Sequence, residues 1–164
     1  MDKIEKVLTQ LQAWEIPYTL YTHPAAPTVE IALKYWKDVP ATHCKNLFFR
    51  NHKGDKHYLV IFACEQQLQI HDLEKRLGQG KLSFASPERM QKYLGLSPGS
   101  VSPFGLINDA QHEVQLFVDE NLAQAEKLSF HPNDNTASVV ISGSDFLKFL
   151  QHCRNSYQFT ALYE

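Results

Sequence analysis

The stretch THCKNLFFRN (residues 42–51) decides the fold that the sequence predicts. Its apolar run at residues 47–49 is typical of a buried strand and is followed directly by Arg50. A second apolar run, HYLVIFA (residues 57–63), comes after a short turn. Gly54 gives that turn the backbone freedom that a tight connection needs. We therefore expect a β-hairpin. Lys45 and Asn46 come directly before the first apolar run, so two polar side chains are expected at the mouth of this hairpin.

Outward from the hairpin, hydrophobic periodicity and capping residues predict a mixture of helices and strands. Because the two kinds of element do not alternate strictly, we expect a single α/β or α+β domain over residues 1–164, with a mixed sheet or barrel-like core flanked by helices. Helices are expected at 2–14, 29–37, 72–77, 87–94, 119–125 and 145–153. Strands are expected at 18–22, 47–50, 58–62, 81–85, 114–118, 127–130 and 136–142.

The composition is that of an ordinary globular protein. The chain has 164 residues, of which 43% are hydrophobic and 21% are charged, values that suit one domain with one core. No apolar run approaches the roughly 18 residues that a membrane helix needs. The amphipathic, acidic start MDKIEKVLTQ is unlike a signal peptide. We therefore expect a cytoplasmic protein that does not interact with membranes.

Three widely spaced cysteines, Cys44, Cys64 and Cys153, are interpreted as reduced structural thiols. His43 precedes Cys44, but adjacent residues of a strand point to opposite faces, which argues against a catalytic Cys/His pair. The sequence contains no CxxC pair and no other ligand set with the spacing of a metal site. We expect neither a metal nor a cofactor.

Charge is distributed unevenly along the chain. Residues 34–92 contain eleven Lys and Arg against six Asp and Glu, whereas the remainder contains five against twelve. Chance scatter over a solvated surface is one explanation. The other is a basic face for a polyanion such as nucleic acid, on an otherwise acidic body.

Known signatures for phosphate loops, dinucleotide binding, metalloproteases and serine hydrolases are absent. Three segments remain conspicuous: CKN (residues 44–46), the turn-rich GSVSPFG (residues 99–105) and FHPNDNTA (residues 130–137). A glycine loop of this kind can bring backbone N–H groups close to a ligand. Each segment alone has an ordinary structural explanation.

Together these segments resemble a known family. CKNLFFRN, KLSFASPERMQKYLGLSPGSVSPFGLIND and FHPNDNTASVVIS, in this order, are similar to the YbaK/ProX aminoacyl-tRNA editing domains, and most of all to the ProXp-ala branch, the prolyl-tRNA synthetase-associated domains. The resemblance covers nearly the whole chain. It implies the fold of that family and a free-standing deacylase that removes alanine from mischarged proline tRNA without a metal or a protein nucleophile. The implied partners are the tRNA acceptor end and, as a further candidate, prolyl-tRNA synthetase.

The resemblance also implies site residues. The family's lysine and asparagine fall on Lys45 and Asn46, and its late histidine falls on His131. The substrate loop falls on Gly99, Ser100, Val101, Ser102 and Pro103. From the residues themselves, the helix 29–37 leads into the Lys45 segment, so Val29, Ala32 and Leu33 are candidates for the pocket wall, with ordinary core residues as the equal alternative. The stretch PAAPTVE departs from many relatives, which leaves the fine shape of the pocket open.

Two alternatives remain open at this point. One is a deacylase of the same family with another specificity, such as cysteinyl-tRNA(Pro). The other is a non-catalytic module that binds tRNA ends or a synthetase. The joint presence of Lys45, Asn46 and His131 favours catalysis, because a binding module has no need to keep all three. Whether His131 or a ribose hydroxyl of the substrate activates water is also open.

Overall fold

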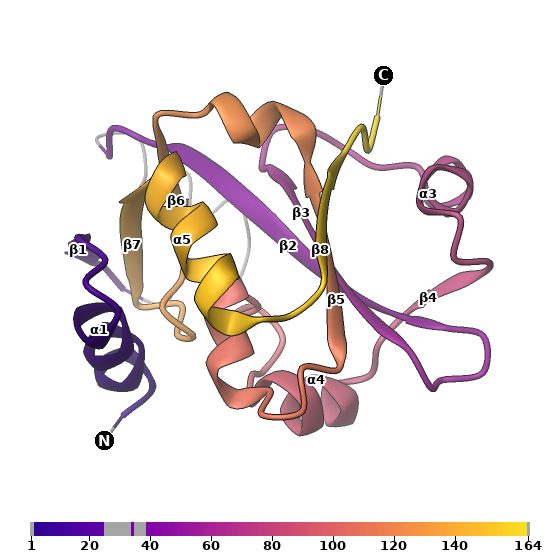
Figure 1. The fold of residues 1–164 in the computed structure, drawn as a ribbon, viewed down its shortest axis with the longest axis horizontal. Coiled ribbons are helices and arrows are strands. Elements are labelled where there is room, and N and C mark those ends of the chain that lie inside the picture. Colours follow the sequence, from indigo (N-terminus) through magenta and orange to yellow (C-terminus); the bar gives the residue numbers. More distant parts are fainter. Residues whose placement is uncertain (1, 25–33, 35–38, 164) are drawn as a thin grey trace.

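The computed structural model describes residues 2–24, 34 and 39–163. Its strands form one mixed sheet in the order β1-β7-β6-β2-β3-β5-β8, with β4 also paired to β2 (Figure 1). The pairs β2–β6, β3–β5 and β5–β8 are parallel and the others are antiparallel. The strands are β1 (Thr19–Thr22), β2 (Thr42–Asn51), β3 (His57–Ala63), β4 (Leu82–Phe84), β5 (Val114–Asp119), β6 (Lys127–Phe130), β7 (Ala137–Ser142) and β8 (Tyr157–Thr160). The predicted fold class, a mixed sheet flanked by helices, is confirmed.

The helices have capping residues that the sequence makes recognisable. Asp2 accepts a hydrogen bond from the Glu5 N–H at the start of the first helix, and Ser86 accepts one from the Arg89 N–H at the start of another. Gly95 ends the latter helix in the left-handed conformation. The α-helices are α1 (Lys3–Ala13), α3 (Ile70–Leu77), α4 (Pro87–Leu94) and α5 (Gly143–Cys153), and the 3-10 helices are η1 (Pro103–Asn108) and η2 (Glu120–Gln124). None of the described helices has the length and apolar character to cross a membrane.

Two hydrophobic clusters lie on opposite faces of the sheet. The larger cluster packs one face against α1, α5 and η1, and α5 crosses in front of β2 (Figure 1). It includes Phe48 of β2 and Phe149 of α5, which are almost completely buried. The smaller cluster packs Phe49 and neighbouring residues of β3 against Leu73 and Leu77 of α3. Because Phe48 and Phe49 are consecutive, β2 contributes to both clusters by simple alternation.

The central strand is longer than the sequence predicted. The expected strand began at Leu47, but β2 begins at Thr42, because its first residues pair with β6. Lys45 and Asn46 therefore lie in the middle of a strand and not at the mouth of the hairpin. The sequence also left the tail after Cys153 without structure, whereas β8 adds a parallel strand beside β5. The helix η1 replaces part of the segment expected to be a loop.

A buried histidine joins the hairpin to α4. The Arg89 guanidinium donates one hydrogen bond to Nε2 of His57 at 2.9 Å and another to the Gly54 carbonyl at 2.8 Å. The His57 ring also packs against Tyr93, with ring centroids 4.0 Å apart. Burial and the positive charges of Arg89 and Lys92 lower the pKa of His57 to about 4. His57 is therefore neutral in the folded protein at pH 7, with its Nε2 as an acceptor.

This histidine should make stability depend on pH. Because the folded-state pKa of about 4 is below the ordinary 6.5, the unfolded chain binds the extra proton first, and stability falls as the pH drops from 6.5 towards 4. His57→Gln keeps an acceptor for Arg89 but does not titrate, so its urea midpoint should fall less between pH 7 and 4.5. His52→Gln, in the exposed turn, is the control and should behave like the parent chain.

Candidate active site

One edge of β2 is open between two neighbouring strands. Along its other edge β2 pairs with β3 from Cys44 to Arg50, but on this edge it pairs only with β6 at its start and with β4 at its end. The described strands leave the middle of this edge, residues 44–47, without a paired strand. The Cys64 N–H donates to the His43 carbonyl, so the backbone groups of His43 point towards β3. The Ala85 N–H donates to the Phe48 carbonyl, so the backbone groups of Phe48 point to the other edge, and those of every second residue do the same. The backbone N–H and carbonyl of Asn46 therefore point into the open edge.

The alternation of β2 separates Lys45 from Asn46. Asn46 shares a face with Phe48, towards the larger hydrophobic cluster, whereas Lys45 lies on the opposite face with Leu47 and Phe49. The Lys45 side chain is exposed. The Oδ1 of Asn46 is buried and has no hydrogen-bond partner within the described residues, although buried polar atoms are ordinarily paired. The two residues thus approach the open edge from its two faces.

The register of β2 and β6 indicates where Lys45 lies relative to His131. Thr42 is opposite Leu128 and His43 is opposite Ser129, where the pairing ends. His131 directly follows β6, and the same register extended by two residues would set Lys45 opposite His131 on one face of the sheet. We infer from this register that two residues far apart in the sequence share one side of the candidate site.

His131 is held at the exit of β6 by the turn that follows. Its Nδ1 lies 2.9 Å from the Ala137 carbonyl, which can only accept, so Nδ1 carries the proton and the lone pair of the neutral ring is on Nε2. Asp134 closes the turn by accepting from the Thr136 N–H and hydroxyl. Burial lowers the pKa of His131; the hydrogen bond to Ala137 opposes this effect and the nearby His23 adds to it. His131 is therefore a neutral base or acceptor near pH 7.

The sequence interpretation missed a second histidine at this site. The rings of His23 and His131 are 6.4 Å apart, and Nε2 of His23 lies 3.3 Å from the Ser138 hydroxyl. His23 follows β1, which pairs with β7, so the contact depends on a strand pairing that spans most of the chain. The pattern around His23 gave no signal for it, since the residue stands beside an ordinary short strand.

The predicted substrate loop divides into two parts. Gly99 is exposed and has φ of +87°, a conformation that favours glycine. Ser102 and Pro103 are buried and start η1, where the Ser102 hydroxyl accepts from the Phe104 N–H. Ser100 N–H donates to the Ser97 carbonyl, whereas the N–H groups of Gly99, Val101 and Ser102 make no hydrogen bond within the described part of the chain. Gly99 is exposed and Val101 is half-buried, whereas Ser102 is completely buried, so the first two residues are the candidate donors to a ligand.

The loop is linked to the turn that holds His131. Asn133 has φ of +64° and is buried, and its Nδ2 donates to the Phe104 carbonyl at 3.3 Å. Phe104 in turn packs edge-on against Phe130, with ring centroids 5.8 Å apart. One buried asparagine therefore connects the residues after β6 with η1. The candidate wall residues Val29, Ala32 and Leu33 lie outside the described residues.

The cysteines do not provide a nucleophile at this site. All three are free thiols, and Cys44 is buried in β2. Burial raises the pKa of Cys44 and raises that of Cys153 to about 12, so both remain protonated and unreactive at neutral pH. No group of three or more His, Cys, Asp or Glu within the described residues could hold a metal ion.

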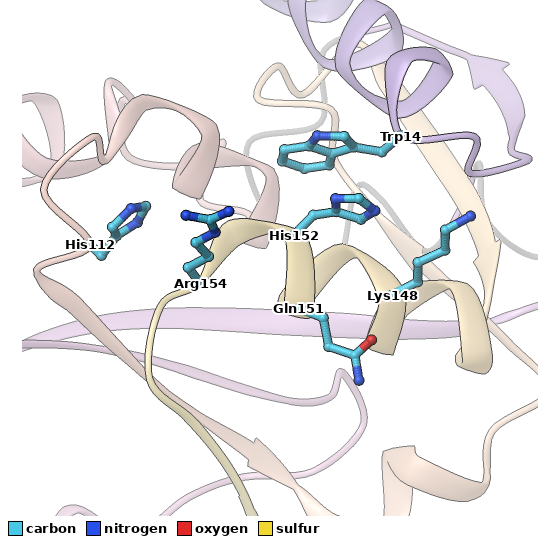
Figure 2. Close-up of a pocket in the computed structure, with 6 residues that line it drawn as sticks. All are labelled: Trp14, His112, Lys148, Gln151, His152 and Arg154. Carbon is cyan, nitrogen blue, oxygen red and sulfur yellow. The ribbon is translucent and has the colours of Figure 1, made fainter.

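A hollow lies at the C-terminal end of α5, and none of the candidate site residues lines it. It has a volume of about 550 Å³ and is lined by Trp14, His112, Lys148, Gln151, His152 and Arg154 (Figure 2). The rings of Trp14 and His152 are stacked 4.9 Å apart, and the Lys148 ammonium donates to the Glu15 carbonyl. The hollow contains none of the sequence-predicted site residues, so we do not assign the reaction to it.

Comparison with known proteins identifies a family for most of the chain. Residues 23–149 match the model of the aminoacyl-tRNA editing domain. The prolyl-tRNA editing protein ProX of Acetoanaerobium sticklandii is 40% identical over 158 residues, which cover 96% of each chain. The prolyl-tRNA synthetase associated domain-containing protein 1 of Bos taurus is 31% identical and covers 87% of this chain and 85% of its own.

The fold is also found among solved structures. A crystal structure of a candidate trans-editing enzyme for prolyl-tRNA synthetase superposes with a TM-score of 0.74 over 98% of each chain, at 18% identity. At this identity the likeness concerns the fold alone. A more distant relative by sequence is the multifunctional Ser/Thr-tRNA deacylase ProXp-y of Escherichia coli, which is 26% identical over 98 residues and covers 59% of this chain and 56% of its own.

Proposed function

The chain belongs to the aminoacyl-tRNA editing-domain family, and from this premise we propose that it is a free-standing trans-editing enzyme that hydrolyses mischarged alanyl-tRNA(Pro). Its class is that of an aminoacyl-tRNA deacylase, as the sequence predicted. The observation that supports the proposal is the parallel pairing of β2 with β6, whose register, extended by two residues, would set Lys45 opposite His131 on one face of the sheet. We further propose that the chain acts as one domain in the cytoplasm on the acceptor end of tRNA, with prolyl-tRNA synthetase as a candidate partner.

The proposed reaction is the attack of water on the ester carbonyl, with the terminal ribose as the leaving group. The Lys45 ammonium suits a point contact with a phosphate of the acceptor end. The N–H groups of Gly99 and Val101, which make no hydrogen bond within the described residues, can donate to the carbonyl oxygen as negative charge develops on it. Neutral His131 presents Nε2 as an acceptor, which can orient the attacking water or take its proton.

Asn46 has a separate role in this scheme. Its backbone N–H and carbonyl point into the open edge of β2, and its buried Oδ1 has no hydrogen-bond partner within the described residues. A substrate ammonium or hydroxyl group would satisfy that oxygen. Because Asn46 lies on the other face from Lys45, we propose that it binds the amino acid, while Lys45 binds the nucleotide. A vicinal ribose hydroxyl remains the alternative to His131 for activating water.

Discrimination between alanine and proline requires a second, smaller site. Alanine and proline differ by little apolar bulk, and a pocket discriminates such differences by only about 1–3 kcal/mol. A synthetase whose pocket fits proline therefore admits the smaller alanine. A separate site that accepts alanine and excludes the proline ring corrects this error after charging.

Three charged tRNAs test this proposal. Alanine on the tRNA(Pro) body should be released quickly, proline on the same body should be retained, and alanine on the tRNA(Ala) body should be released more slowly, since an enzyme blind to the tRNA would destroy a necessary product. Release of free amino acid at fixed ionic strength is the measurement, and the rate should fall as salt rises because the basic excess of residues 34–92 attracts phosphate. Rapid release of proline would refute size exclusion.

The same assay separates the alternatives. The relative ProXp-y is named for serine and threonine, so seryl- and threonyl-tRNA belong in the panel together with cysteinyl-tRNA(Pro). Faster release of one of these than of alanine would change the substrate but keep the reaction. Binding of tRNA without release of any amino acid would favour a non-catalytic module.

A further inference from the structure

An aromatic side chain is exposed on the same face as Lys45. Phe84 of β4 is 57% exposed, against 36% for Leu20 and 37% for Leu147, the other exposed large apolar residues of the described chain. Its Cα is paired with that of Phe49, and side chains that are directly opposite in a pair of strands lie on the same face. Phe84 therefore lies beside Phe49, at the end of the row that Lys45, Leu47 and Phe49 form along β2.

The Phe84 ring is held in place by a neighbouring ring, that of Phe49. It stacks on Phe49 with ring centroids 4.7 Å apart and an angle of 28° between the planes. Phe49 is completely buried, so the ring on which Phe84 stacks belongs to the packed core. An exposed ring that is already ordered loses little conformational freedom when a second planar group stacks on it. Packing of the core explains Phe49, but it does not require an aromatic ring at position 84.

The spacing between Lys45 and the Phe49–Phe84 pair suits the unpaired end of a tRNA. From Lys45 to Phe49 the strand advances four residues, or about 13 Å, and Leu47, which is half-buried, lies between them. If the aminoacyl ester is bound beside Lys45 and His131, the nucleotides that precede the terminal adenosine have to leave the site over a neighbouring surface. Unpaired bases are bound in proteins chiefly by stacking on aromatic side chains.

We propose that Phe84 is a stacking platform for the base of an unpaired nucleotide next to the terminal adenosine of the tRNA. The inference rests on the proposed function, since it takes the position of the ester from it. Stacking of this kind tolerates any base. It would hold the acceptor strand in register with Lys45 without selecting a tRNA by sequence.

Kinetics on a long and a short substrate test the role of Phe84. Phe84→Ala should raise KM for alanyl-tRNA(Pro) by about 5- to 100-fold, the range for loss of one stacked base. The alanyl ester of adenosine lacks the preceding nucleotides, so its KM should rise far less. Phe84→Trp keeps a stacking surface and should restore the KM for tRNA. Leu147→Ala, which removes another exposed apolar side chain, is the control, and melting temperatures show that each variant is folded.

A fluorescent base gives a direct readout. With 2-aminopurine in place of the nucleotide before the terminal adenosine, binding to the parent chain should quench the fluorescence, and Phe84→Ala should restore it. Equal KM values for Phe84→Ala and Leu147→Ala, or unchanged quenching, would overturn the proposal. If the parent chain hydrolyses neither substrate, the proposed function is wrong, and the quenching alone then decides whether the base stacks on Phe84.

Discussion

Lys45→Ala should lower kcat/KM for alanyl-tRNA(Pro) by on the order of 10- to 150-fold, which corresponds to the loss of one hydrogen bond between charged groups, about 1.5–3 kcal/mol. The fold should not change, because the side chain is exposed and lies outside both hydrophobic clusters. The strand pairing of Lys45 with Phe62 uses only the backbone. The removed group is therefore a charge at the open edge of β2 and not a part of the core.

The measurement combines a deacylation time course with circular dichroism on the same preparation. Lys127→Ala removes an exposed charge from β6 and controls for the change in net charge. Lys45→Arg keeps the charge but changes its shape, so partial activity in that variant would indicate a point contact with phosphate. A folded Lys45→Ala protein with near-normal rates would remove Lys45 from the site.

His131→Ala should slow hydrolysis by about 10²–10⁴-fold if the imidazole acts as an acid or base, and by less if it only orients water. Since burial lowers the pKa of His131 below its usual value, the ring is neutral above pH 6.5 and becomes protonated only as the pH falls further. The parent kcat/KM should therefore be constant above this pH and decline below it. The variant should lose that decline together with most of its rate.

The control for this experiment has to lie away from His131. His23 is unsuitable, because its ring is 6.4 Å from that of His131 and its replacement should disturb the same site. His152 is exposed on α5 and stacks on Trp14 (Figure 2), so His152→Ala tests the general effect of losing a histidine. Equal, small losses in His131→Ala and His152→Ala, with an unchanged pH profile, would make His131 a structural residue only.

The sequence predicted the parts of the fold that are encoded locally. The hairpin of β2 and β3 follows from two apolar runs and a glycine turn, and Gly54 has φ of +76° in the structure. The start of β2 could not be predicted in this way, because residues 42–46 mix polar and apolar side chains. Thr42 and His43 belong to the strand through pairing with β6, and residues 44–46 through pairing with β3. The strand β8 likewise depends on β5, its parallel partner.

The residues of the candidate site remain a prediction, and their arrangement in space could not be derived from the sequence. Lys45, Asn46 and His131 were proposed from the family resemblance, and no spacing in the sequence indicates that Lys45 and His131 share a face. The alternation that argued against a His43–Cys44 pair also separates Lys45 from Asn46, which the sequence interpretation had placed together. The proximity of His23 to His131 depends on the β1–β7 pairing, which no local pattern could reveal.

The pairing of β2 with β6 also governs when the molecule can become active during its synthesis. Lys45 leaves the ribosome long before His131, and at roughly 5–20 residues per second several seconds of translation separate them. Throughout this interval β1 lacks its partner β7 and the start of β2 lacks β6. The nascent chain therefore exposes unpaired strand edges, which favour association with other chains. A chain that stops before β6 would hold Lys45 on a hairpin without His131, and we expect it to release no amino acid from tRNA.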